Sequence, residues 1–104
     1  MNQIERISKM GALLKSAEAA CDELDGAIER LAEALAQYDK EQENFDILTE
    51  YYEGDEWMRD FEDDEAGLIP QSIDRGALTE DSIYDLLLRR KDLDEILQAL
   101  RSYL

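Results

Sequence analysis

Residues 51–67, YYEGDEWMRDFEDDEAG, hold the densest group of side chains in this chain that could do chemistry. Four of the eight aromatic residues lie there, together with eight carboxylates and a single cation, Arg59. Clustered carboxylates supply the oxygen ligands that Ca²⁺ and Mg²⁺ prefer, and a pair of carboxylates can act as acid and base in glycoside hydrolysis. The segment therefore raises the question of a metal site or an active site.

The spacing of these carboxylates matches no known metal loop. A calcium loop needs acidic or amide residues at alternating positions before its glycine, but Ala66 takes the third of those positions before Gly67. The chain has no histidine, so the usual general base at neutral pH and the histidine ligands of iron sites are both missing. We expect no catalytic, cofactor-binding or metal-ligand residues and predict that the protein is not an enzyme. Weak binding of a divalent cation by the carboxylates of residues 55–65 is an alternative.

The acidity of the chain lies in its middle. Of the net charge of -16, residues 41–88 contribute sixteen anions against two cations, Arg59 and Arg75. A nucleic acid and an anionic membrane would both be repelled, because each binds proteins through Lys and Arg. We therefore expect no nucleic-acid or membrane partner. A basic protein, bound by an acidic face that imitates nucleic acid, is a possible partner, and such a complex would be sensitive to salt.

The N-terminal half carries a single helical pattern over about residues 3–52. Apolar residues recur at alternating spacings of three and four, as in a heptad repeat. We call the following nine positions the N-terminal seam: Ile7, Met10, Leu14, Cys21, Leu24, Ile28, Leu31, Leu35 and Tyr38. Cys21 is interpreted as a small buried apolar residue of this seam. The hydrophilic stretch of residues 39–44 is the expected place for a bend.

Two further helices are predicted after Gly54. A short helix over about 55–65 ends at Gly67 as its C-terminal cap, and a loop over about 66–78 contains Gly76, which suits a positive φ. The last helix, about 80–103, has Thr79 as its expected N-cap. Its apolar stripe consists of Ile83, Leu86, Leu87, Leu93, Ile96, Leu97, Leu100 and Leu104. We predict an all-α protein, a single domain over 1–104 whose last helix packs back antiparallel as a helical hairpin or bundle.

The segment 51–67 is then interpreted as a structural corner with an acidic outer face. The apolar corner consists of Tyr52, Trp57, Phe61 and Tyr84, and the candidate polar residues beside it are Asp60, Asp64, Glu65 and Arg75. Arg75 is expected to pair with Asp60, Asp64 or Asp81. A role of Arg75 in anchoring a ligand is the alternative.

Helix lengths bear on assembly. A helix over 3–52 would be about 75 Å long and the last helix about 36 Å, so a hairpin would cover only half of the first helix. The uncovered part needs either a bend near 39–44 or a second copy of the chain, because a bare apolar stripe promotes aggregation. We favour a homodimer through the N-terminal seam over a bent monomer.

The order YYEGDEWMRDFEDDEAGLIP followed by DRGALTEDSIYDLL, with the opening Ile4–Met10 helix, resembles a family of small bacterial proteins catalogued only as a domain of unknown function. This chain has Thr79 where the family usually has Ser, which preserves a capping hydroxyl, and Ala77 where Val is common. The resemblance implies an all-helical, cytoplasmic bacterial protein and no known activity. The single cysteine and the lack of a signal peptide or membrane span also favour the cytoplasm. We expect a non-catalytic interaction or assembly module.

Overall fold

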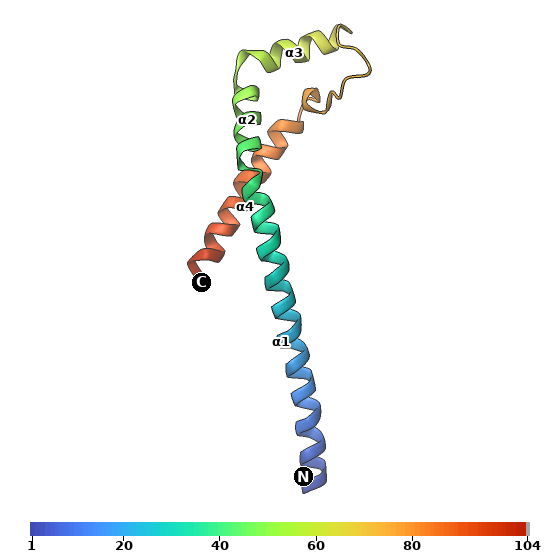
Figure 1. The fold of residues 1–104 in the computed structure, drawn as a ribbon, viewed down its shortest axis with the longest axis vertical. Helices are drawn as coiled ribbons and strands as arrows, with labels where there is room; N and C mark the ends of the chain where they lie inside the picture. Colours follow the sequence, from blue (N-terminus) through green and yellow to red (C-terminus); the bar gives the residue numbers. More distant parts are fainter. Residues whose placement is uncertain (104) are drawn as a thin grey trace. The chain divides into compact units, whose positions relative to one another are not determined.

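The computed structural model describes residues 1–103, with Tyr103 described by its backbone alone, so the predicted stripe residue Leu104 lies outside the described residues. The described chain consists of α1 (Gln3–Lys40), α2 (Gln42–Glu53), α3 (Asp55–Glu65), the 3-10 helix η1 (Gly76–Leu78) and α4 (Ser82–Tyr103) (Figure 1). No strand occurs among these residues. The predicted all-α class is confirmed.

Helix α1 begins at a side-chain cap and ends within the hydrophilic stretch. The Asn2 side-chain oxygen accepts a hydrogen bond of 2.8 Å from the Glu5 N–H, which satisfies one of the donors left free at a helix start. At the other end the Glu41 N–H donates to the Tyr38 carbonyl at 3.1 Å. This three-residue spacing tightens the last turn, and it separates α1 from α2 without a proline. The chain divides here into two compact units, the first being Met1–Glu41 and the second beginning at Gln42.

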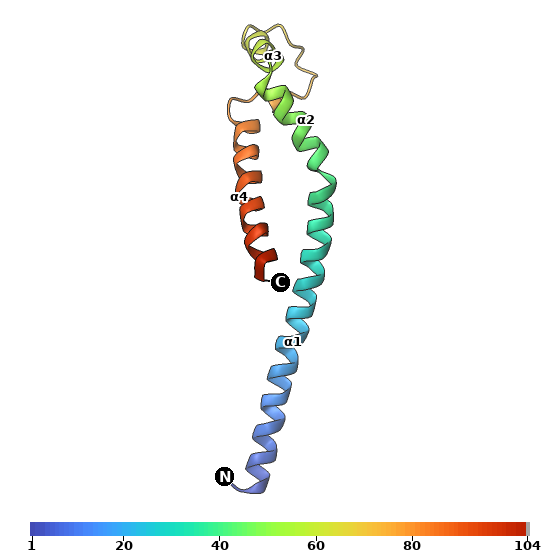
Figure 2. The same ribbon diagram turned by 90° about the vertical axis from the view of Figure 1, so that its left-hand side faces the viewer.

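In the second unit, α4 runs in the opposite direction to α2 and packs against it (Figures 1 and 2). Arg90 joins the two helices: its guanidinium donates to Gln42 at 2.8 Å and to Asp46 at 3.1 Å. The same group lies over the Phe45 ring, 5.0 Å from the ring centroid, in a cation–π contact. Among the described residues, only Trp57 and Ile83 are buried apolar residues, at 7% and 4% exposed.

Two glycines fix the ends of α3. At Gly54, between α2 and α3, a Cβ would come within 3.1 Å of the Glu50 carbonyl oxygen, a tight contact, so the close approach of the backbone favours a glycine. Gly67 has a φ of 77°. The Leu68 N–H donates to the Asp63 backbone carbonyl at 2.9 Å, and the Gly67 N–H donates to the Asp64 backbone carbonyl at 3.0 Å. This is the bond pattern of a Schellman cap. The predicted cap at Gly67 is therefore present.

Two local predictions were wrong. Gly76 was expected to take a positive φ, but among the described residues only Gly67 does so, and Gly76 begins η1. Thr79 was expected to cap α4, but the helix begins at Ser82. The 3-10 turn explains both differences, because the hydroxyls of Thr79 and Ser82 donate back to the Gly76 carbonyl at 3.1 Å and 2.8 Å. Thr79 thus closes the turn and does not cap the helix.

Candidate functional site

The apolar corner is centred on Trp57. The Tyr52 ring meets Trp57 edge-on with centroids 4.9 Å apart, and Phe61 stacks on Trp57 at 5.2 Å. The indole N–H donates to the Ala77 carbonyl at 2.8 Å, so a buried donor is paired with η1. Three of the four predicted corner residues are thus brought together.

Tyr84 is not part of this cluster. It is 50% exposed, whereas the preceding residue, Ile83, is buried at 4%. Neighbouring helix residues point about 100° apart because an α-helix has 3.6 residues per turn. The placement of Tyr84 in the corner is therefore corrected: the buried apolar side chain near the start of α4 is that of Ile83.

The polar residues beside the corner lie in separate contacts. The Arg75 guanidinium pairs with Asp64 at 2.8 Å, and Asp64 was one of the three predicted partners. Their side chains are 33% and 20% exposed. Asp60 accepts a 2.6 Å hydrogen bond from the Tyr51 hydroxyl. Glu65 makes neither contact and lies at the rim of an open depression of about 420 Å³, which is lined by Phe61, Asp64, Glu65, Arg75, Leu78, Thr79 and Glu80.

Tyr51 was not among the predicted site residues. Burial, the hydrogen bond to Asp60 and the charges of Asp60 and Glu56 raise the pKa of Tyr51 from 10.0 to about 12. The phenol therefore stays protonated, and the hydrogen bond that it donates to Asp60 joins α2 to α3. The signal lay in the YY pair: on a helix the first tyrosine points about 100° away from the second, so a tyrosine beside Tyr52 could reach a different side of α3.

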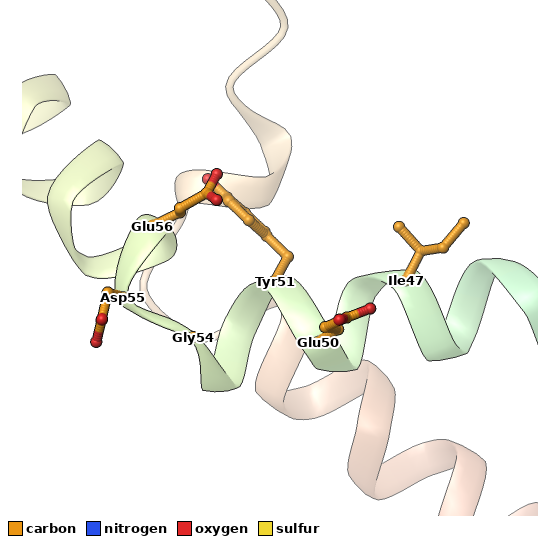
Figure 3. A pocket seen from close by; sticks show the side chains of 6 residues that line it. All are labelled: Ile47, Glu50, Tyr51, Gly54, Asp55 and Glu56. Atoms are coloured by element: carbon orange, nitrogen blue, oxygen red, sulfur yellow. The ribbon is translucent and has the colours of Figure 1, made fainter.

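An acidic recess of about 410 Å³ lies where α2 meets α3 (Figure 3). Its lining residues are Ile47, Glu50, Tyr51, Gly54, Asp55 and Glu56. In Figure 3 the Tyr51 side chain extends toward Glu56, whereas Asp55 points to the other side of the chain. The carboxylates thus diverge. In the part of the chain that the structure describes, no group of three or more His, Cys, Asp or Glu residues is placed to hold a metal ion.

The N-terminal seam has a different character, because its apolar side chains are exposed. Six of its residues are between 44% and 61% exposed: Ile7, Met10, Leu14, Leu24, Ile28 and Leu31. Leu35 and Tyr38, near the end of α1, are half-buried. Cys21 is exposed as well, so its interpretation as a buried residue does not hold within a single chain. The exposed seam is the largest regular apolar feature of α1.

The fold and these surfaces define an acidic all-α protein with a long N-terminal helix and a small helical corner. The chain belongs to the family described as Domain of unknown function (DUF4298), whose model matches residues 7–100. The resemblance inferred from residues 51–87 is thereby confirmed. No curated protein and no solved structure matches the chain. Among the described residues, no helix is both long enough and apolar enough to cross a membrane.

Proposed function

We propose that this protein is a non-catalytic helical assembly module that forms a homodimer through the N-terminal seam. The main observation in support of this proposal is that the seam on α1 is exposed. Six of its large apolar residues are at least 44% exposed, although their heptad spacing is the pattern by which helices bury apolar side chains against each other. A continuous exposed apolar surface of this kind marks an interaction site or an aggregation hazard.

The length of the seam supports a second copy as the partner. From Ile7 to Tyr38 the seam runs about 47 Å along the helix axis, at about 1.5 Å per residue. The next longest helix described, α4, has 22 residues and is about 33 Å long by the same rule. A second α1 has the full length and the same heptad period. A two-fold dimer would let each copy use this one surface.

The charge of α1 also suits self-association. Residues 1–40 carry five cations and eight anions, a net charge of -3, whereas residues 41–88 carry -14. Two α1 helices can therefore approach with little repulsion. The acidic segment would in turn keep the assembly soluble.

The test is the mass of the protein in solution and its response to a charge placed in the seam. The wild-type chain is expected to have twice the mass of one chain in light scattering after gel filtration. Leu24→Glu should give a monomer, because the carboxylate would be buried in the dimer without a partner. Leu24 is 61% exposed in the single chain, so the substitution removes little packing there.

The matched control is Ala19→Glu. Ala19 lies on the opposite face of α1 from the seam and is exposed, so this variant adds the same charge to the same helix and should stay dimeric. A wild-type chain that is monomeric at all concentrations would refute the proposal. A dimer that survives Leu24→Glu would mean that the contact lies elsewhere.

A further inference from the structure

We infer that the two α1 helices of the dimer run antiparallel, in the register that places Ile7 of one copy opposite Tyr38 of the other. In this register Leu14 faces Leu31 and Cys21 faces Leu24 of the second copy. The inference rests on the proposed function, because it names the direction and register of that same contact. Two independent features of α1 support this direction and register: the sizes of the seam side chains and the distribution of charge along the helix.

The first feature is the presence of small residues at the middle of the seam. Ala17 lies between Leu14 and Cys21 in the same heptad pattern. In a parallel pair each position meets itself, so Ala17 would face Ala17 and Cys21 would face Cys21. Two successive layers would then be underfilled, and a void in an apolar contact is destabilising.

The antiparallel register removes that defect. Ala17 then faces Ile28, and Cys21 faces Leu24 of the second copy, so each small side chain lies opposite a large one. Alternation of small and large residues across a contact is how packed layers fill space. The same register places Tyr38, the largest seam residue, opposite Ile7 and not opposite a second tyrosine. Every position of the heptad pattern from Ile7 to Tyr38 keeps a partner.

The charges of α1 favour the same direction. Residues 3–20 carry three cations and two anions, whereas residues 21–40 carry two cations and six anions. A parallel pair would place the two acidic halves side by side. An antiparallel pair places each acidic half beside the weakly basic half of the other copy. Exposed charges interact over about 8 Å at physiological ionic strength, which is the separation between packed helices.

The test uses engineered cysteines in a Cys21→Ala chain, so that no other thiol is present. Chains with Leu14→Cys and chains with Leu31→Cys are oxidised separately and after mixing, with oxidised glutathione as the electron acceptor. Two thiols lose their protons and form one disulfide, and glutathione disulfide is reduced to two glutathione molecules. A disulfide needs Cα atoms within about 7 Å. We expect most of the mixed sample to form a dimer in which a Leu14→Cys chain is linked by a disulfide to a Leu31→Cys chain. Either sample oxidised alone should form little disulfide.

The other outcomes are distinct. If Leu14→Cys links to itself, the pair is parallel and the inference is overturned. A third set of chains carries Leu24→Cys and is mixed with the Leu14→Cys chains in the same way. If these two link, the helices are antiparallel but shifted by one heptad, which overturns the register. If nothing links and light scattering finds the wild-type chain monomeric, the proposed dimer itself fails. A Cys21→Ala dimer that links in none of these mixtures would also overturn the register.

Discussion

Arg75 shows how a single cation is used among many acids. It is one of two cations among the sixteen carboxylates of residues 41–88, and it is paired with Asp64 at 2.8 Å. The pair connects the loop before η1 to the last turns of α3. The sequence could predict the pairing, because a cation in such surroundings finds a carboxylate. It could not choose between Asp60, Asp64 and Asp81, since the choice depends on the path of the loop.

Arg75→Ala is expected to lower the free energy of unfolding by about 1 kcal/mol, because the pair is partly exposed and its attraction is screened by water. Urea unfolding followed by Trp57 fluorescence measures the change. Arg59→Ala is the control: it removes an equal charge from exposed Arg59, which makes no ion pair among the described residues. If the two variants were equally stable, Arg75 would not stabilise the loop, and a role in anchoring a ligand would gain support.

Tyr51 makes the stability of the folded chain depend on pH. Burial, the hydrogen bond to Asp60 and the nearby carboxylates raise the pKa of Tyr51 from 10.0 to about 12. Between these pH values the unfolded chain loses the phenol proton while the folded chain keeps it. The contribution of Tyr51 to stability is therefore complete below pH 10 and is lost as the pH rises toward 12.

In Tyr51→Phe, stability should decline less steeply from pH 10 to pH 12 than in the wild-type chain. Urea unfolding midpoints measured by circular dichroism across that range provide the comparison. Tyr84→Phe removes a half-exposed phenol outside the apolar corner and should keep the wild-type decline. Parallel declines in all three proteins would show that the Tyr51–Asp60 bond does not contribute.

At the scale of elements, the sequence predicted best where one residue type determines the backbone. Gly67 ends α3 because a φ of 77° suits glycine, and the short helix follows from the spacing of Trp57 and Phe61. Prediction failed at Gly76–Ser82. There the hydroxyl of Thr79 had two possible uses, capping a helix or closing a turn, and only the position of the Gly76 carbonyl decides between them.

The candidate surfaces were also predictable to different degrees, because one depends on local spacing and the other on contacts between distant residues. The heptad spacing of α1 is a local property of the chain, so the N-terminal seam could be read directly from the sequence. The corner depends on contacts between distant residues. The acceptor of the Trp57 indole, the Ala77 carbonyl, is twenty residues away and carries no sequence signal, because every residue has a carbonyl. Ile83 and Tyr84 are neighbours whose roles separate only when α4 is oriented.

At the scale of the whole molecule, the two units differ in charge and in surface. The N-terminal unit has a small net charge and exposed apolar side chains at heptad spacing. The unit that begins at Gln42 holds the aromatic corner and most of the acidic residues. This division supports an assembly role, because the unit with the smaller net charge exposes its apolar side chains at heptad spacing along one helix.

The proposed antiparallel register has one unfavourable feature, and this feature makes a further test. Glu18 and Asp25 flank the seam on the same side and would face each other across the dimer, twice because of the two-fold symmetry. Glu18→Lys converts both repulsions into attractions and should stabilise the dimer by about 1 kcal/mol at low salt, since an exposed pair contributes a few tenths of a kcal/mol. That corresponds to a dissociation constant about five-fold lower.

Sedimentation equilibrium measures this dissociation constant, and Glu33→Lys is the matched control. Glu33 lies on the face of α1 opposite the seam and is exposed, so the substitution makes the same change in net charge without a partner across the contact. In a parallel pair Glu18 would face Leu13 of the second copy, and the two substitutions would then have equal effects. A gain confined to Glu18→Lys therefore supports the antiparallel register by a thermodynamic route that needs no cross-link, whereas equal effects would contradict it.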